Sequence, residues 1–229
     1  MKIEALSWDS DFFGLRIGKA VVNSKDDVVL LSGYQGLRND FDLLYIFTTP
    51  TISIGLEGFE LVDNKVIYSK QVRGGRPLDC CARLFNDERP NASLYDLAIQ
   101  SGVYSRFKLD NRFPVGSFER LYHRWIEQSV CGNMADAVFY VGDEDDMKGM
   151  LTLKIENEVG RIGLVAVNHG CRGNGYGTVL LDTAEYYLYT KQIQTIEVAT
   201  QLDNTRACHW YEKNGFAKKS VTSIYHLWL

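Results

Sequence analysis

The apolar residues of the second half of the chain recur at regular spacings. Five large apolar side chains after Ser117 stand at i, i+3, i+4, i+7 and i+8, which predicts an amphipathic helix capped by Ser117 and ended by Gly132. Strand-length apolar runs and helical patterns then alternate. They predict helices over 176–190 and 203–214, and strands over 137–141, 148–155, 160–167, 194–200 and 220–228.

The first half is richer in β-like runs and contains one clear helix, at 93–102. Its aromatic-rich start, 6–14, predicts a short helical turn that Ser7, Asp9 or Ser10 can cap. Segment 73–91, with Gly74, Gly75, Pro77 and Pro90, and acidic run 143–146 predict a loop and a hairpin turn. The predicted strands are 17–22, 43–49, 59–62 and 65–72, the last two joined by a turn at Asp63-Asn64.

The two halves meet at segment 105–114, which is loop-like and rich in cations. We place a domain boundary near Asn111, so that a smaller α/β domain (1–111) precedes a second domain (112–229). A chain of 229 residues is long enough for two such units and can bury a sizeable core.

Composition limits the class of protein. A hydrophobic fraction of 45% with 12% aromatic residues is typical of a folded globular protein. The net charge of −4 leaves no overall basic field for nucleic acid. The sequence shows no signal-peptide pattern and no membrane-spanning apolar run, so we expect no membrane insertion. Five cysteines, including adjacent Cys80 and Cys81, indicate free thiols in a reducing cytoplasm. The four histidines lack metal-ligand spacing, so we expect no metal site.

A glycine-rich segment lies between the strand at 160–167 and the helix at 176–190. Gly173, Gly175 and Gly177 alternate there, which lets the backbone approach a ligand closely. Unpaired N–H groups at a helix start, with the helix dipole behind them, favour a phosphate group. The segment lacks the lysine of a P-loop and the spacing of a dinucleotide-binding fingerprint. The alternative is a glycine-rich connector without a ligand.

Two motifs carry a resemblance to a known family. Arg172-x-x-Gly-x-Gly177 resembles the pyrophosphate loop of the GCN5-related N-acetyltransferases (GNAT), which bind acetyl-coenzyme A. Asn204-x-x-Ala-x-x-x-Tyr211-x-x-x-Gly-Phe216 resembles the family's last motif, and the two motifs stand in the family's order. The resemblance implies an α/β fold with a mixed, largely antiparallel sheet flanked by helices, here preceded by the smaller N-terminal α/β domain.

The resemblance also implies roles for single residues. The pyrophosphate ligands would be Arg172, Gly173, Asn174, Gly175, Tyr176 and Gly177. The backbone of Val165 and Val167, whose side chains are core, would bind the pantetheine arm. Asn204 would contact the cofactor, or only cap its helix, and Arg172 could act through its side chain or its backbone. Tyr211 would protonate the leaving thiolate; the alternative is a core aromatic residue.

Three further segments narrow the resemblance: Trp8–Gly14, Ser105–Phe107 and Val198–Gln201 are similar to the dTDP-fucosamine acetyltransferase group. Members of that group acetylate the amine of a dTDP-linked 4-amino-4,6-dideoxy sugar for surface polysaccharide. Arg106, Lys108 and Arg112 form a cationic cluster that could meet the diphosphate, or could be solvated linker charges.

Several alternatives stay open at this point. The acceptor could be another primary amine, such as a peptide N-terminus, a polyamine or an antibiotic, or the chain could be a non-catalytic acyl-CoA-binding module. The general base is unassigned among His169, Glu197 and a chain of water molecules. We therefore expect a small-molecule amine and acetyl-CoA as partners, with no nucleic acid, and we leave a homodimer open.

Overall fold

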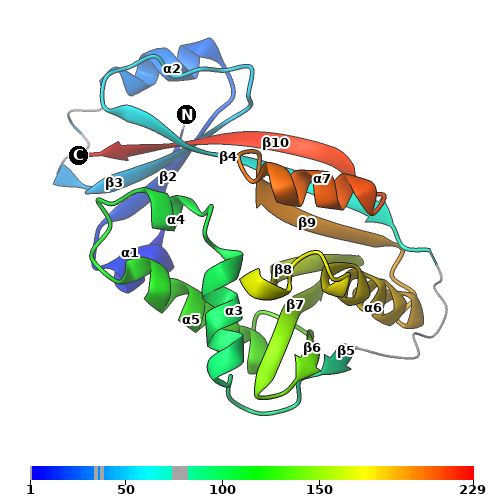
Figure 1. Cartoon of the computed structure of the whole chain (residues 1–229). Helices are drawn as coiled ribbons and strands as arrows, with labels where there is room; N and C mark the ends of the chain where they lie inside the picture. The colour runs from blue at the N-terminus through cyan, green and yellow to red at the C-terminus, as the bar shows by residue number, and fades with distance from the viewer. Residues whose placement is uncertain (1, 34–35, 37–38, 74–81) are drawn as a thin grey trace.

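The computed structural model describes residues 2–33, 36, 39–73 and 82–229. Figure 1 shows the course of the chain. The helices are α1 (Ser7–Phe13), α2 (Lys25–Leu31), α3 (Ala92–Ser101), α4 (Arg106–Leu109), α5 (Ser117–Val130), α6 (Tyr176–Thr190) and α7 (Thr205–Lys213). The strands are β1 (Ile3–Ala5), β2 (Ile17–Val22), β3 (Leu43–Thr48), β4 (Phe59–Gln71), β5 (Ala82–Leu84), β6 (Ala137–Asp143), β7 (Asp146–Glu156), β8 (Val159–Val167), β9 (Thr195–Gln201) and β10 (Ala217–Trp228).

The strands form one ten-stranded sheet in the order β1-β2-β3-β10-β4-β9-β8-β7-β6-β5. The pairs β2–β3 and β8–β9 are parallel, and the other neighbours are antiparallel. The last strand, β10, lies between β3 and β4, so it connects the two halves of the chain. The expected α/β fold with a mixed, largely antiparallel sheet is confirmed, whereas the boundary near Asn111 stays a prediction.

Helices cover the sheet on both sides, and we name the sides by their longest helices. On the α5 face, α3, α4 and α5 pack with residues of α1, β2, β3 and β6–β8 in one apolar cluster. On the α6 face, α6 and α7 pack with Val66, Tyr68, Ile196 and Val198 in a second cluster. Figure 1 shows the two groups of helices on opposite sides of the central strands.

Most elements with a clear period form where the sequence predicts them. The five periodic apolar residues of α5 lie against the sheet, with Phe118, Leu121 and Ile126 fully buried. The helix start is different from the prediction, because Gly116 rather than Ser117 is the N-cap. In α1 the hydroxyl of Ser10 does not cap the helix but accepts the N–H of Ile17, and Leu6 occupies the cap position.

The predicted turn at Asp63-Asn64 is wrong, because β4 runs straight through it and pairs with β10 on both sides. A register shift leaves Val62 without a partner in the ladder, and this β-bulge allows the strand to continue. The backbone and side chain of Asn64 are both bound, to Leu202 N–H at 2.9 Å and to the hydroxyl of Ser223 at 2.8 Å. Tertiary contacts therefore override the turn preference of an Asp-Asn pair.

The sequence does not predict three short elements, β1, α2 and β5, and α4 lies inside the predicted linker. Gly74, Gly75, Pro77, Cys80 and Cys81 lie outside the described residues. Cys131, Cys171 and Cys208 are free thiols. Within the described ranges no helix is both long and apolar enough to cross a membrane, and no cluster of three or more possible ligand side chains could hold a metal ion.

Candidate active site

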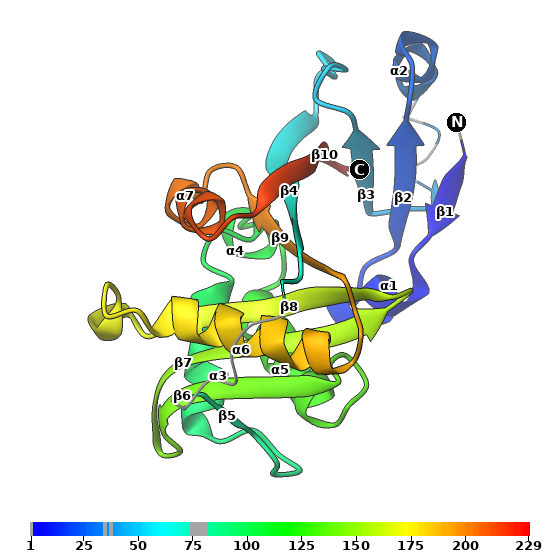
Figure 2. The same ribbon diagram turned by 90° about the vertical axis from the view of Figure 1, so that its right-hand side faces the viewer.

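The parallel strands β8 and β9 separate halfway along their length. They pair from Val159 and Thr195 as far as Ile162 and Val198, after which β8 stays paired only with β7. A β-bulge lies at this point, where Gly163 and Leu164 both face Thr152. The Leu164 N–H donates to the Thr152 hydroxyl at 2.8 Å. Figure 2 shows the two strands diverging, so one edge of β8 at 163–167 is left without a β9 partner.

The absence of a side chain at Gly163 leaves room for the Thr152 hydroxyl at this bulge. A Cβ atom at this position would lie 2.9 Å from the Thr152 hydroxyl oxygen, too close for an ordinary contact. Val165 and Val167 lie on the separated part of β8 and are half-buried rather than fully in the core as expected. Their predicted backbone role is compatible with the unpaired strand edge on which they lie.

The glycine-rich loop follows β8 directly and ends at the first turn of α6. Gly173 (φ +88°) and Gly175 (φ +82°) adopt left-handed backbone conformations, and Gly175 is the N-cap of α6. The side chain of Arg172 folds back, with Nε donating to the Val167 carbonyl at 3.2 Å. The Asn174 side chain donates to the Cys171 carbonyl at 3.1 Å. These bonds fix the loop against the end of β8, while the first N–H groups of α6 have no partner within the helix.

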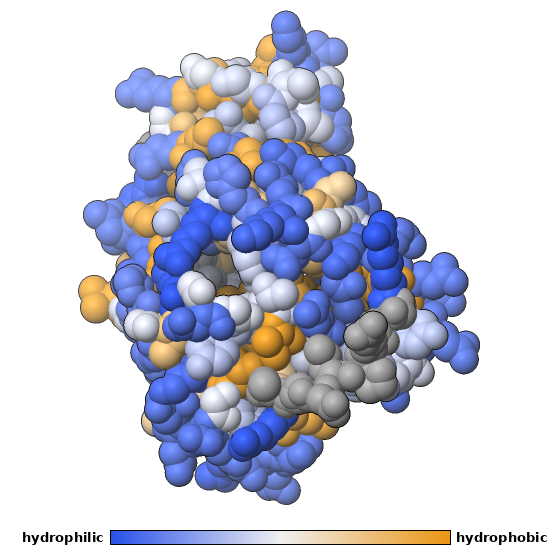
Figure 3. All heavy atoms as spheres, turned by 45° about the vertical axis from the view of Figure 1, so that its right-hand side comes forward, coloured by the Kyte–Doolittle hydropathy of each residue, from blue (hydrophilic) through white to orange (hydrophobic). Residues whose placement is uncertain are grey.

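The helix α7 packs against the first turn of α6. A Cβ on Gly177 would lie 2.8 Å from the ring of Trp210, so only glycine permits this approach. The hydroxyl of Thr178 lies 3.4 Å from the side-chain oxygen of Asn214. The two sequence motifs, which are separated by a strand, therefore meet in space. Figure 3 shows a hollow bordered by hydrophilic side chains near the middle of the face that carries α6 and α7.

Tyr211 lies on α7 with its ring packed among Tyr68, Trp210 and Phe216, at centroid distances of 4.8–5.8 Å. Burial, and to a lesser extent the thiol of Cys208, raises the pKa of Tyr211 above its ordinary value. The side chain therefore stays a phenol at neutral pH and can donate a proton. It is both a core aromatic residue and a possible acid, since the two sequence interpretations do not exclude each other.

Asn204 is the N-cap of α7, and its side-chain oxygen accepts the Ala207 N–H at 3.2 Å. The capping role considered from the sequence is thus confirmed, while its contact with a cofactor stays a prediction. The cap holds α7 at the end of β9, beyond the separation from β8. Among the residues that the structure describes, its amide nitrogen has no hydrogen-bond partner and can bind a ligand.

The two side chains considered as general bases have different surroundings. Glu197 is buried on β9 and ion-paired with Lys219 at 2.5 Å and with Arg161 at 3.7 Å. His169 is exposed in the loop, where its backbone N–H donates to the Gln100 side chain at 3.0 Å. Glu197 is therefore already engaged by two cationic side chains.

The predicted cationic cluster of Arg106, Lys108 and Arg112 does not act as a unit. Arg112 forms ion pairs with Asp110 and Glu60, both at 2.8 Å. Lys108 is exposed and lies 3.4 Å from Glu119. Arg106 is half-buried, and its guanidinium carbon lies 4.9 Å and 4.3 Å from the ring centroids of Tyr45 and Phe107. Arg106 alone therefore has no carboxylate ion pair within the described residues.

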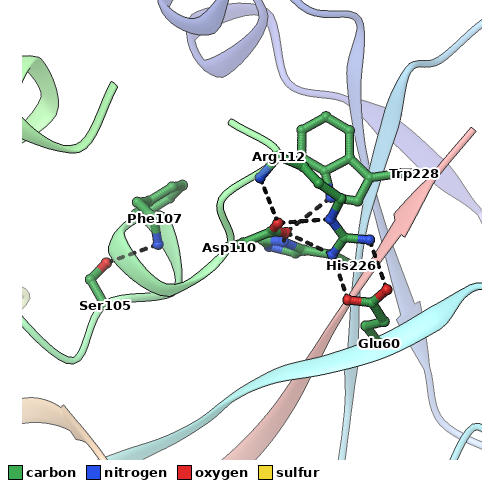
Figure 4. Close-up of polar contacts among 7 residues, drawn as sticks. All are labelled: Glu60, Ser105, Phe107, Asp110, Arg112, His226 and Trp228. Carbon is green, nitrogen blue, oxygen red and sulfur yellow. Dashed lines mark hydrogen bonds and ion pairs between the residues drawn. The ribbon is translucent and has the colours of Figure 1, made fainter. Parts of the chain in front are cut away.

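Figure 4 shows why Arg112 is held: Asp110 is the centre of a buried network. The Asp110 carboxylate accepts hydrogen bonds from Arg112 Nε at 2.8 Å and Trp228 Nε1 at 2.9 Å, and lies 2.7 Å from His226 Nδ1. Burial alone would raise the pKa of Asp110, but these hydrogen bonds outweigh it and hold the pKa well below its usual range. The network fixes the end of β10 to the segment after α4.

Two polar residues on the α5 face, Tyr45 of β3 and Asp63 of β4, are not among the site residues that the sequence predicts. Both are buried, and each has a polar atom without a hydrogen-bond partner among the described residues. The sequence predicts a turn at Asp63, and Tyr45 stands in an apolar run. Neither position therefore carried a sequence signal for a site.

Comparison with known proteins places this geometry in a family. The sequence model of the "Acetyltransferase (GNAT) family" matches residues 83–216. The dTDP-fucosamine acetyltransferase of Escherichia coli O6:H1 (strain CFT073) is 28% identical over 218 residues, which cover 93% of this chain and 92% of that protein. The mycothiol acetyltransferase of Rhodococcus erythropolis (strain PR4) is 29% identical over 143 residues, 60% of this chain and 44% of that protein.

Solved structures share the fold. A GCN5-related N-acetyltransferase from Sphaerobacter thermophilus aligns over 98% of this chain and 75% of its own, with a TM-score of 0.66 and 14% identity. The PaiA N-acetyltransferase of Thermoplasma acidophilum, solved in complex with coenzyme A, aligns over 66% of this chain and 100% of its own, with a TM-score of 0.50 and 15% identity. With the separated strands, the glycine loop and the match over 83–216, the chain belongs to the GNAT family of acetyltransferases.

Proposed function

We propose that this acetyltransferase uses acetyl-CoA to acetylate the amine of a dTDP-linked amino-dideoxy sugar, a precursor of surface polysaccharide. The observation that carries the proposal is the 28% identity with a dTDP-fucosamine acetyltransferase, because it extends over 93% of this chain. The similarity therefore includes the N-terminal strands and the α5 face as well as the part that the family shares.

The cofactor site is built from the backbone. In the proposal, the N–H groups of loop residues 172–177 bind the pyrophosphate, with the dipole of α6 behind them. The pantetheine arm runs along the unpaired edge of β8 and bonds to the backbone of Val165 and Val167. Arg172 acts by holding the loop, since its Nε is bound to the Val167 carbonyl. Asn204 offers its amide N–H to the cofactor while its oxygen caps α7.

The reaction requires one bond to form and one to break. The neutral amine attacks the thioester carbonyl, the tetrahedral intermediate collapses by breaking the C–S bond, and coenzyme A leaves as a thiolate. As the C–S bond breaks, Tyr211 donates its phenolic proton to the leaving sulfur, and the proton that the nitrogen releases returns through water to the phenolate and restores the phenol. The nitrogen loses its proton to water, since Glu197 is already paired with two cations.

The proposal is tested by following coenzyme A thiol release with purified protein, acetyl-CoA and a panel of amines. The panel contains dTDP-4-amino-4,6-dideoxygalactose, spermidine, a short peptide with a free N-terminus and an aminoglycoside. We expect the highest kcat/KM for the nucleotide sugar. Release only with a peptide, polyamine or antibiotic would overturn the sugar assignment, and tight coenzyme A binding without release for any amine would indicate a binding module.

A further inference from the structure

Four buried side-chain polar atoms have no hydrogen-bond partner among the described residues. Three of them surround the Arg106 guanidinium: the Tyr45 hydroxyl on β3, Oδ1 of Asp63 on β4 and Nε of Arg106 on α4. The fourth is Nε2 of His226 on β10, whose ring stacks 5.0 Å from that of Tyr45. An unsatisfied buried polar group destabilises the folded state, and native proteins contain few of them. Three such atoms from three separate elements indicate a place where a ligand completes the hydrogen bonding.

The three side chains lie close together. The guanidinium of Arg106 stacks 4.9 Å from the ring centroid of Tyr45. Burial raises the pKa of Asp63 to about 6, and the charge of Arg106 is the strongest influence in the other direction. Arg106 also counteracts the effect of burial on the pKa of Tyr45. Arg106 is therefore the central charge of the group, and its half-buried side chain reaches the surface.

This group borders an uncovered part of the sheet. Asp63 and Lys65 are alternate residues of β4 and point to the α5 face, since Val66 belongs to the cluster on the opposite face. Lys65 pairs with Gln201 and Ile67 with Ala199, and Ala199 is exposed although β9 is a central strand. Ala199 and Gln201 lie beyond the point where β8 leaves β9. The group is thus next to the strand separation, on the face opposite α6.

The chemistry of the group suits a hydroxyl group better than a phosphate. The carboxylate of Asp63 accepts hydrogen bonds, Arg106 only donates them, and the Tyr45 hydroxyl does both. Asp9 on α1 also lies near Arg106, whose charge lowers the pKa that burial of Asp9 raises. The carboxylates of Asp63 and Asp9 balance the charges of Arg106 and Lys65, so no excess positive charge remains for a diphosphate, whereas a hydroxyl can donate to Asp63 and accept from Arg106.

Two segments that identified the closer resemblance build this place together. Phe13, from 8–14, and Phe107, from 105–107, stack with ring centroids 5.5 Å apart. Their contact fixes α1 against α4 and so positions Asp9 and Arg106 on the same side of the sheet. Two segments that are far apart in the sequence therefore pack together and position the same group of polar side chains.

We propose that Asp63, Arg106 and Tyr45 bind the acceptor through the ring hydroxyl next to its amine, and so select a hydroxylated amino sugar. The inference rests on the proposed function. The hydroxyl donates to Asp63 and accepts from Arg106, with the Tyr45 hydroxyl as a second partner. A site that holds a substrate hydroxyl in this way rejects the deoxy analogue strongly, because its buried polar groups are then left unpaired.

The test compares two acceptors, dTDP-4-amino-4,6-dideoxygalactose and its analogue without the hydroxyl next to the amine. We expect the wild type to prefer the hydroxylated acceptor in kcat/KM by at least ~100-fold, a conservative figure for this kind of recognition. Asp63→Asn and Arg106→Met should reduce the preference to less than about tenfold, by lowering kcat/KM for the hydroxylated acceptor, while the coenzyme A Kd stays unchanged.

Controls separate this site from general damage. Asp182→Asn and Arg124→Met remove exposed charges on α6 and α5, and should keep the full preference. Tyr45→Phe removes a single oxygen and should lower the preference about tenfold even if the Asp63 variant does not fold. Equal losses with both acceptors would show a structural role and overturn the inference, as would an unchanged preference. If the wild type acetylates no sugar at all, the proposed function fails instead.

Discussion

The proposed cofactor side and the proposed acceptor side of this protein are built by different means. The glycine loop presents consecutive backbone N–H groups, and its shape follows from Gly173, Gly175 and the Arg172–Val167 hydrogen bond within a few residues. The acceptor side collects Tyr45, Asp63 and Arg106 from β3, β4 and α4. Most substitutions leave the N–H groups of a backbone site in place, so its ligand stays the same. In a site made of side chains, a single substitution can change which substrate binds.

Removal of Asp110 should have the largest effect, because Asp110 holds the acceptor side together. Asp110→Ala leaves Arg112, His226 and Trp228 without their shared acceptor, and we expect the free energy of unfolding to fall by about 3 kcal/mol. Urea denaturation measures this free energy of unfolding. Asp182→Ala, at an exposed position of α6, should change it by less than about 0.5 kcal/mol. If the two sides are built independently, Asp110→Ala protein that is kept folded at low temperature should still bind coenzyme A. Loss of coenzyme A binding in this folded variant would refute that independence.

Tyr211→Phe should act on the chemical step alone. The ring contacts with Tyr68, Trp210 and Phe216 remain, so we expect coenzyme A to bind normally while turnover falls at least ~10-fold. Steady-state kinetics and a coenzyme A titration measure the two quantities. Turnover equal to that of the wild type would remove Tyr211 from the mechanism.

The loop should tolerate side chains unequally. Gly175→Ala forces a Cβ into a left-handed conformation at the start of α6, at a cost of about 1 kcal/mol, so the coenzyme A Kd should rise roughly fivefold. Gly170→Ala is the matched control in the same loop, since its backbone is not left-handed and the nearest atom to a new Cβ is 3.9 Å away. Isothermal titration calorimetry with coenzyme A compares the dissociation constants of the two variants. Equal affinities for both variants would mean that the loop geometry does not set the binding of the cofactor.

The smallest effect should be a change in pH dependence. The pKa of Asp63 is raised from 3.8 to about 6, so the folded protein binds a proton between these pH values that the unfolded chain does not. This contribution to stability is present below pH 3.8 and is lost as the pH rises through 6. Asp63→Asn removes it, so the free energy of unfolding should fall more steeply from pH 6 to pH 4 than in the wild type. Identical slopes in urea denaturation across this range would show that Asp63 is not perturbed.

Features that depend on neighbours in the chain were predictable. The helix α6 begins at Tyr176 and ends at Thr190 as predicted, and the glycine loop precedes it. Asn204 caps α7 as its residue type suggests. The periodic apolar residues of α5 lie on the sheet. In each case the local sequence contains both the hydrogen-bonding groups and the apolar face that stabilise the element.

Features that depend on distant partners were not predictable. The turn assigned to Asp63-Asn64 is a strand because β10, about 160 residues later in the chain, pairs with it. The cations of 105–114 looked alike in the sequence, yet Arg112 is held by Asp110 and Glu60 while Arg106 stacks on Tyr45. Residue type and spacing could not distinguish these outcomes, because the partners come from other strands.

The sequence by itself determined the loop, its flanking helix and the family of this acetyltransferase, since a backbone phosphate site needs only glycines and a helix start in the right order. Only the tertiary structure decided where β8 leaves β9, which cations are paired with carboxylates, and that Tyr45, Asp63 and Arg106 lie together. Sheet pairing and burial act between segments that are far apart in the chain. They determine which polar atoms remain unpaired, and so where a substrate can bind.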